Sequence, residues 1–513
     1  MQRIPLDKAS VPLIVAIDIG TSSVRALLYD GEARMVDASE CQLPYEMRTT
    51  ADGGAEVDAD EIVDLTLRCL DHIEALVAPR VADLGSVALT SFWHSFMGLD
   101  ATGAASTPVY SWADKRSGPD VRALKRTIDS DAFHAATGCV LHSTYWPGKL
   151  HWLRRVHPDA AARTRQWVSF ADYLALRLHG EAITTVSMAS GTGLLDVHAC
   201  EWHDGLLAAF GVDRAMLPRL TDRSDPLPPL LPPFAERWPN LATAPWLPAI
   251  GDGATANVGA GCVSPKALAL TIGTSGALRV IDERDTFAVP ADTWCYRLDR
   301  KRIVLGGALS NGGNIASWIA KGIGDGDGIG NFDRLTADAE AIGPDGHGLT
   351  FLPFLAGERS PSWNDEATGT IHGLTLTTRP GDLFRAALEA IAYRFAAIYD
   401  ALIDEVTARD GAHVINANGA AVLRSPLWLQ IIADTLNHPI VALEPEEEAS
   451  ARGTAICALE AIGARADLTP STPTVMTYEP DAGHHERYAA ARQRQRRLEQ
   501  TLYPQQVIGR DAN

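Results

Sequence analysis

The feature that most constrains the fold is a tetrad that occurs twice. Ile-Gly-Thr-Ser stands at residues 19–22 and again at 272–275. Apolar runs flank both copies, before and after the turn, as expected for two strands joined by a tight glycine-containing turn. One such hairpin in each half of the chain predicts a duplicated architecture.

The two turns also have the chemistry of a phosphate site. Glycine lets the backbone approach a ligand closely, and neighbouring N–H groups and Thr/Ser hydroxyls donate hydrogen bonds to anionic oxygens. A single turn of this composition is more often purely structural. Two copies favour a pair of phosphate-binding turns on opposite sides of a cleft.

Length, cysteine usage and charge narrow the class of protein. A chain of 513 residues is long enough for two or more domains, and none of its apolar runs approaches the 20 or so residues of a membrane span. The N-terminus lacks the apolar core of a signal peptide, and the seven scattered cysteines lack zinc-site spacing. We therefore expect free thiols and a cytoplasmic location.

The net charge of −19 argues against nucleic acid or an anionic membrane as the main partner. An anionic substrate would need a local basic pocket in such a chain.

Helical and strand-like patterns alternate along the chain. Residues 58–77 predict an amphipathic helix with acids in its first turn, and a strand follows at 86–89. Further helices are predicted at 169–180, 382–406 and 426–436, with a strand at 414–417. This alternation predicts an α/β fold. Residues 322–330, GIGDGDGIG, lack the ligand spacing of a Ca²⁺ loop and predict a mobile loop.

Two charged residues lie in or beside the first hairpin. Asp18 interrupts its first apolar strand, and a buried carboxylate is costly without a partner. It could face Mg²⁺ beside bound phosphates, or accept N–H bonds from its own turn; the sequence leaves both open. Arg25, on the return strand, could reach a phosphate or lie on the surface.

A candidate substrate site follows the strand at 86–89. His94 stands just after that strand, where sites form in α/β folds, although an isolated histidine is more often structural. Trp112, Asp114 and Arg116 combine an aromatic wall with charges, as a polyhydroxylated ligand requires. The alternative is a solvated loop. Lys149 lies in an aromatic and basic stretch further on.

The second half contains further glycine-rich turns. Asp252 stands between Gly251 and Gly253, and Gly313 opens a predicted helix. Gly419 and Ala420 follow a predicted strand and precede a helix, an arrangement found at nucleotide sites and also at ordinary turns.

From about residue 12 to 462, the chain resembles the FGGY carbohydrate kinases of the actin/hexokinase-like superfamily. The stretches that carry the resemblance are DIGTSSVR (18–25), GDGATANVGAG (251–261), TIGTSGA (271–277) and GTIHGLTLTTRPGDLFRAALE (369–389). Within the family, SWADKRS (111–117) and FLPFLAGERSPSWN (351–364) are most similar to gluconate kinases. Trp146 departs from a family signature, because Pro, Ser or Thr is usual there.

The resemblance implies two actin-like, ribonuclease H-like α/β domains with a catalytic cleft between them. We place the N-terminal domain at 12–252, the C-terminal domain at 253–465 and a helical tail at 466–513. It also implies ATP and Mg²⁺ as cofactors. The implied residues are Asp252 as general base; Asp18 for Mg²⁺; Gly20, Thr21, Ser22, Ser23, Arg25, Gly273, Thr274, Gly313, Gly419 and Ala420 for ATP; and His94, Trp112, Asp114, Arg116, Lys149 and Asp252 for the sugar.

The expected activity is transfer of the γ-phosphoryl group of ATP to a sugar or sugar acid, with D-gluconate giving 6-phosphogluconate as first choice. Arg116 and Lys149 are expected to supply cations for the gluconate carboxylate. A xylulose, other pentulose or polyol kinase is the alternative within the family. An ATP-driven binding protein without kinase activity, or an inactive regulator, is the alternative from another class. The sequence does not decide whether the chain forms a homodimer.

Overall fold

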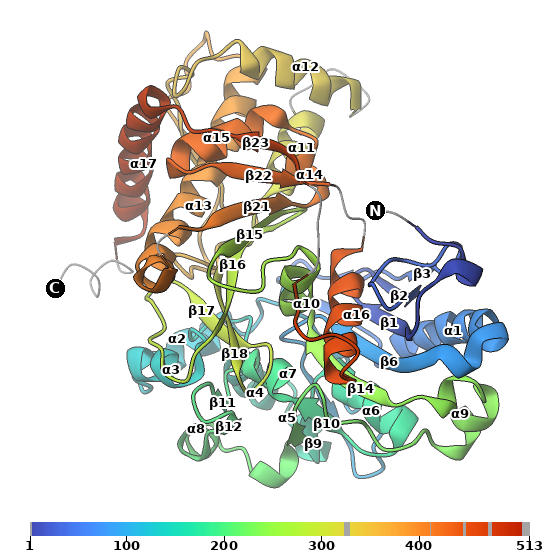
Figure 1. The fold of residues 1–513 in the computed structure, drawn as a ribbon. Coiled ribbons are helices and arrows are strands. Elements are labelled where there is room, and N and C mark those ends of the chain that lie inside the picture. The colour runs from blue at the N-terminus through green and yellow to red at the C-terminus, as the bar shows by residue number, and fades with distance from the viewer. Residues whose placement is uncertain (1–2, 323–328, 411, 445–447, 470–473, 505–513) are drawn as a thin grey trace.

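Two large sheets form the framework of the computed structural model, which describes residues 3–322, 329–410, 412–444, 448–469 and 474–504 (Figure 1). The first sheet has the order β14-β6-β1-β2-β3, and the second β17-β18-β16-β15-β21-β22-β23. The strands of the first are β1 Leu13–Ile19, β2 Ser23–Tyr29, β3 Cys41–Pro44, β6 Leu84–Ser91 and β14 Trp246–Gly251. Those of the second are β15 Ala267–Ile272, β16 Gly276–Glu283, β17 Trp294–Arg297, β18 Arg302–Leu309, β21 Val414–Asn418, β22 Ile440–Leu443 and β23 Thr474–Tyr478.

The same strand arrangement occurs in both sheets. In the first, β1 pairs antiparallel with β2 and parallel with β6, and β6 pairs parallel with β14. In the second, β15 pairs antiparallel with β16 and parallel with β21, and β21 pairs parallel with β22. The repeated tetrad closes the equivalent hairpin in each sheet, so the predicted duplication and both predicted hairpins are confirmed.

Helices cover the sheets and connect their strands. Those of the first half are α1 Ala59–Val77, α2 Gly118–Leu124, α3 Ser130–Thr137, α4 Trp146–Val156, α5 Pro158–Arg163, α6 Phe170–His179, α7 Val186–Ser190, α8 Asp204–Ala209 and α9 Pro232–Arg237. Those of the second half are α10 Asp252–Gly259, α11 Gly313–Gly322, α12 Ile329–Glu340, α13 Pro380–Asp410, α14 Ala420–Leu423, α15 Pro426–Leu436, α16 Ala449–Ala461 and α17 Ala482–Leu502. The helices predicted around 58–77, 169–180, 382–406 and 426–436 are confirmed as α1, α6, α13 and α15.

Short strands complete the structure. They are β4 Arg48–Thr49, β5 Ala55–Val57, β7 Met97–Leu99, β8 Val109–Tyr110, β9 Gln166–Val168, β10 Ile183–Thr185, β11 Leu195–Asp196, β12 Glu201–Trp202, β13 Arg219–Thr221, β19 Thr350–Leu352 and β20 Thr370–His372. Most of them belong to a long insertion between β6 and β14. Most of the loop predicted at 322–330 lies outside the described residues. No helix in the described ranges is long and apolar enough to cross a membrane.

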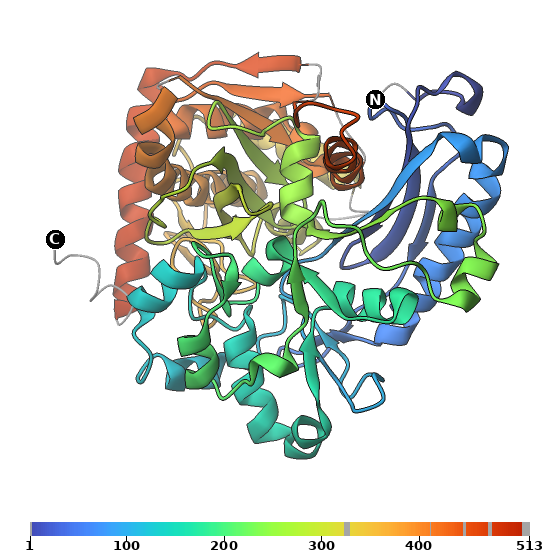
Figure 2. The same cartoon turned by 60° about the horizontal axis from the view of Figure 1, so that its bottom comes forward.

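Helices α10 and α16 lie side by side between the two sheets (Figures 1 and 2). Their backbones approach so closely that a Cβ on Gly259 would overlap the carbonyl of Ala449. Helix α16 also packs on β1 and β6, and its buried residues join the core of the first sheet. This pair of helices therefore links the two halves of the molecule.

Candidate active site

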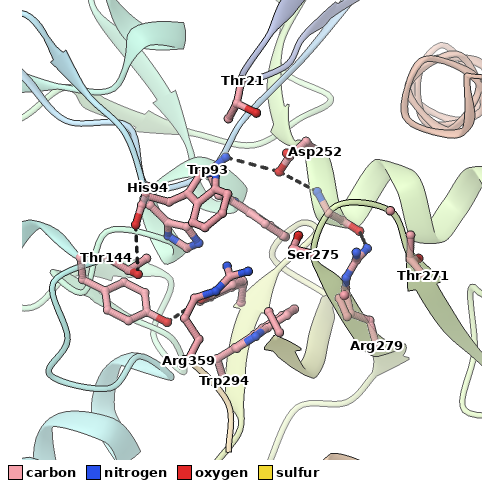
Figure 3. Close-up of a pocket in the computed structure, with 18 of the residues that line it drawn as sticks. Thr21, Trp93, His94, Thr144, Asp252, Thr271, Ser275, Arg279, Trp294 and Arg359 are labelled. Atoms are coloured by element: carbon pink, nitrogen blue, oxygen red, sulfur yellow. Dashed lines mark hydrogen bonds between the residues drawn. The ribbon is translucent and has the colours of Figure 1, made fainter. Parts of the chain in front are cut away.

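A cavity of about 310 Å³ lies between the two halves of the molecule (Figure 3). Its walls come from both sheets, from the insertion in the first half and from the loop after β19. The lining residues are Thr21, Trp93, His94, Trp112, Thr144, Tyr145, Asp252, Gly253, Thr271, Gly273, Ser275, Gly276, Ala277, Arg279, Trp294, Tyr296, Ala308, Arg359 and Trp363.

Asp252 stands at the junction of β14 and α10. Its Oδ1 accepts hydrogen bonds from the backbone N–H groups of Gly253 (2.8 Å) and Trp93 (3.4 Å). The indole of Trp93 packs so closely that a Cβ on Gly251 or Gly253 would overlap it, which explains the glycines around this aspartate. The carboxylate keeps access to the cavity, but the surrounding protein raises its pKa, while the charge of Arg279 opposes that shift.

Asp18 lies at the end of β1, near enough to Asp252 for their charges to interact. Burial is the main reason that its pKa rises to about 7; Arg25, whose Nη1 is 3.7 Å from Oδ2, partly offsets this. No described residue donates a hydrogen bond to the carboxylate of Asp18, and the turn amide of Gly20 donates to Ser23 O instead. Arg25 also pairs with Glu448, just before α16, at 2.9 Å.

Aromatic side chains form much of the cavity wall. The rings of Trp294 and Tyr296 on β17 stack with centroids 4.2 Å apart, and the Tyr296 hydroxyl lies 2.6 Å from that of Tyr145. Trp93 packs edge-on against Tyr296 at 4.8 Å. Such walls suit the C–H faces of a sugar.

His94 adds a neutral ring to this wall. Its Nδ1 is 2.6 Å from Gly191 O, and burial lowers its pKa to about 3. His94 is therefore uncharged near neutral pH and can offer one ring nitrogen to a ligand as donor or acceptor.

Two arginines bring positive charge to the cavity. Arg279, on β16, donates from Nη1 to Gly253 O at 2.9 Å. Arg359 donates from Nη2 to Leu309 O at 3.1 Å, and its guanidinium lies 4.5 Å from the centre of the Trp112 ring. Burial lowers the pKa of both, that of Arg279 to about 10.

Three of the charged residues predicted for substrate do not line this cavity. Arg116 pairs with Asp114 and Glu56, each at 2.5 Å, and stacks on Trp152 at 4.6 Å. Asp114 also accepts from the amide of Ala55.

The third is Lys149, which is buried. Its ammonium donates to the carbonyls of Ser143 and Thr144 and so holds the segment that brings Thr144 and Tyr145 to the cavity. Arg116 and Lys149 were expected to meet a substrate carboxylate; in this structure, protein groups already bind both cations.

A second, larger cavity of about 930 Å³ lies next to the first on the side of the second sheet. Gly273 lines both cavities, so the second tetrad turn stands where they meet. The predicted nucleotide residues in the larger cavity are Gly273, Thr274, Gly313 and Ala420.

Of the remaining predicted nucleotide residues, Thr21 lines the smaller cavity, whereas Gly20, Ser22, Ser23, Arg25 and Gly419 line neither cavity. Gly419 precedes α14 with φ 99°, and a Cβ there would lie 2.5 Å from Ile272 O, so only glycine fits this turn.

Comparison with known proteins identifies the family. Residues 13–259 match the model of the FGGY carbohydrate kinase N-terminal domain, and residues 268–462 match that of the C-terminal domain. The chain belongs to the FGGY family of carbohydrate kinases. Kinases of this family use ATP and act on sugars. The boundary between our two domains at 252/253 stays a prediction.

This FGGY kinase is similar to relatives that differ in substrate. It is 28% identical over 460 residues to a gluconokinase of Bacillus subtilis, covering 88% of each chain. It is also 28% identical to a xylulose kinase of Escherichia coli, covering 96% of this chain and 99% of the relative.

Solved structures show the same fold. A gluconate kinase of Lactobacillus acidophilus superposes with a TM-score of 0.87 at 24% identity, covering 97% of this chain and 100% of that one. A xylulose kinase of the same organism gives 0.86 at 24% identity, covering 97% and 99%. The two-domain α/β architecture predicted for this FGGY kinase is thus confirmed.

Several residues that line the cavity of this FGGY kinase were not predicted from the sequence. Arg359 and Trp363 lie in the stretch 351–364, whose sequence indicates the family but not a site. Arg279 follows the second tetrad by four residues, on the same strand as Gly276, and Trp93 precedes His94. The position of Arg279 soon after a glycine turn could have indicated a site residue. No comparable pattern indicated that Arg359 faces a ligand.

Proposed function

We propose that this FGGY kinase transfers the γ-phosphoryl group of ATP to a sugar acid, with gluconate as the preferred acceptor. The observation that carries the proposal is the pair of cavities that meet at Gly273. The aromatic cavity holds the acceptor and the larger one holds the nucleotide. The γ-phosphate then lies at the second tetrad turn, with Asp252 on the acceptor side.

Asp252 acts as the general base in this proposal. It takes the proton of the acceptor hydroxyl as that oxygen forms a bond to the γ-phosphorus. The bond between the γ-phosphorus and the β–γ bridging oxygen breaks, and ADP leaves with that electron pair. With gluconate, reaction at the terminal hydroxyl gives 6-phosphogluconate.

Mg²⁺ fits the carboxylates on the first sheet. Asp18 and Asp252 interact electrostatically, and burial raises the pKa of both carboxyl groups, so a bound cation would stabilise their ionised forms. Carboxylate oxygens are preferred Mg²⁺ ligands, so Asp18 is the residue proposed to hold the ion or its waters. The ion would supply neutralisation of phosphate charge.

The charge of the cavity favours gluconate over xylulose. The similarity includes both gluconokinases and xylulose kinases at equal identity, so it does not decide between them. Two arginines face the cavity of a protein whose net charge is −19, a local excess of positive charge that suits an anionic acceptor.

The activity is tested by measuring ADP release from Mg²⁺-ATP with gluconate, xylulose, glycerol or no acceptor. The proposal predicts that release depends on the acceptor and is fastest with gluconate at low acceptor concentration. Release that is equal with and without every acceptor would indicate an ATP-driven binding protein instead.

A further inference from the structure

The cation at Arg359 is available to a ligand in a way that Arg116 and Lys149 are not. Within the described ranges, no carboxylate lies at ion-pair distance from its guanidinium, and its Nε is buried without a hydrogen-bond partner. Arg116 and Lys149, by contrast, are fully engaged by protein groups. Leaving a charge in such surroundings without a counter-ion is unfavourable, so an incoming anion would complete the site.

The loop that carries Arg359 is firmly held. The amide of Ser360 donates to Ala308 O at 3.0 Å, and Asn311 Nδ2 donates to Gly357 O at 2.9 Å. The carboxylate of Glu358 accepts from Arg394 Nε at 2.7 Å. The guanidinium therefore needs little ordering to bind a ligand, which favours affinity.

Arg359 and Asp252 lie on different sides of the cavity. In Figure 3, Thr21 and Asp252 lie above and Arg359 lies below, with Trp93 between them. An acceptor with a hydroxyl at one end and a carboxylate at the other can therefore reach both groups at once. Gluconate has this form, since its carboxylate and its terminal hydroxyl are at opposite ends of the carbon chain.

We propose that Arg359 binds the carboxylate of the acceptor and thereby selects sugar acids over neutral sugars. The proposal rests on the proposed function, because it presumes that the aromatic cavity holds the acceptor. Trp112 supports the cation from one face through its ring. Arg279 binds the carbonyl of Gly253, next to the proposed base Asp252, so we assign it to the end of the acceptor that reacts.

The test measures kcat/KM for two substrates with each of three forms of the enzyme. Gluconate is compared with gluconamide, which keeps the hydroxyls and lacks the charge, for the wild type, Arg359→Met and Arg359→Lys. We expect Arg359→Met to lower kcat/KM for gluconate by about 10- to 100-fold, mainly through KM, and to change that for gluconamide less than about threefold. Arg359→Lys keeps the charge and should recover part of the preference.

Arg116→Met is the matched control, because Arg116 also stacks on a tryptophan but lies outside the cavity. It should lower the melting temperature and leave the gluconate-to-gluconamide ratio unchanged. Calorimetric binding of both compounds to each folded variant gives a second readout if turnover is slow.

Equal loss for both substrates in Arg359→Met would overturn the inference and place Arg359 at the phosphoryl group. An unchanged gluconate preference in that variant, or a preference that Arg116→Met abolishes, would overturn it too. In each of these cases the wild type still phosphorylates gluconate, so the proposed function survives. A wild type that phosphorylates neither compound contradicts the proposed function itself.

Discussion

At the residue scale, the central prediction concerns Asp252, the proposed general base. Its carboxylate is fixed by two backbone amides, and one oxygen remains to receive a proton. Asp252→Asn keeps the shape and removes the basicity. We expect kcat to fall by about 10²-fold or more, the scale of general-base catalysis, with the affinity for ATP nearly unchanged.

Steady-state kinetics and calorimetric ATP binding check this, with the melting temperature as a control for folding. An Asn variant that retains wild-type kcat at saturating acceptor would exclude Asp252 as the base.

The ionisation of Asp18 affects the stability of the fold. Its pKa in the folded protein is about 7, above its ordinary 3.8, because the carboxylate is buried. Protonated Asp18 therefore contributes stability that is fully present below about pH 4 and is lost as the pH rises through 7.

We predict that Asp18→Asn is more stable than the wild type at pH 8, by on the order of a few kcal/mol, and that the difference shrinks towards pH 4.5. Urea unfolding in the presence of EDTA measures it, and other titrating groups cancel between the two proteins. A difference that does not depend on pH would show that Asp18 is not a buried, titrating carboxylate.

Local patterns could identify some site residues and not others. Asp252 was recognisable from its flanking glycines, and His94 and Trp112 from a strand end and a polar-aromatic cluster; the structure brings all three to one cavity. The pairing of Arg116 with Glu56 could not be predicted, because Glu56 is 60 residues away in sequence. Whether a charge is free or paired depends on such distant contacts, which no short pattern records.

At the scale of elements, the hairpins and long helices were predictable because each depends on its own residues. Strand periodicity and the turn determine a hairpin, and Asp58 caps α1 by accepting from the amides of Asp60 and Glu61. The packing of α16 on the first sheet was not predictable, since a helix sequence does not tell which sheet it will contact.

The start of α11 gives a prediction at this scale. A Cβ on Gly313 would lie 2.5 Å from Gly273 O and 2.8 Å from Ala421 Cβ, so Gly313→Ala must shift the second tetrad turn. We expect a stability loss of about 1–3 kcal/mol and ATP binding weakened by roughly tenfold.

Gly322→Ala is the control, because Gly322 ends the same helix and, among the described residues, nothing lies within 4 Å of the added Cβ. Its stability should change by less than about 0.5 kcal/mol. Equal ATP affinity in the two variants would contradict the role of the Gly313 contact.

At the scale of the whole molecule, the cavity lies where two halves meet. Contacts already cross between them, since Lys115 donates to Ala356 O and Ser143 Oγ donates to Asp365 Oδ1 at 2.7 Å. The two tetrad turns face the cavity from different sheets, through Thr21 and Gly273. Closing them on the nucleotide would exclude water from phosphoryl transfer.

Small-angle scattering tests this closure. The radius of gyration should decrease when gluconate and a non-hydrolysable ATP analogue are both bound, and less with either alone. An unchanged radius with both ligands demonstrably bound would indicate a cleft that is already closed.

The central claim is that this FGGY kinase phosphorylates a sugar acid, and internal competition tests it most directly. The protein is given Mg²⁺-ATP with equal concentrations of gluconate, xylulose and glycerol in one solution, and the first products are identified by mass spectrometry. Because the acceptors compete for the same enzyme, the product ratio equals the ratio of their kcat/KM values. The account predicts gluconate phosphorylated at its terminal hydroxyl as the main product; a main product from xylulose or glycerol would contradict it.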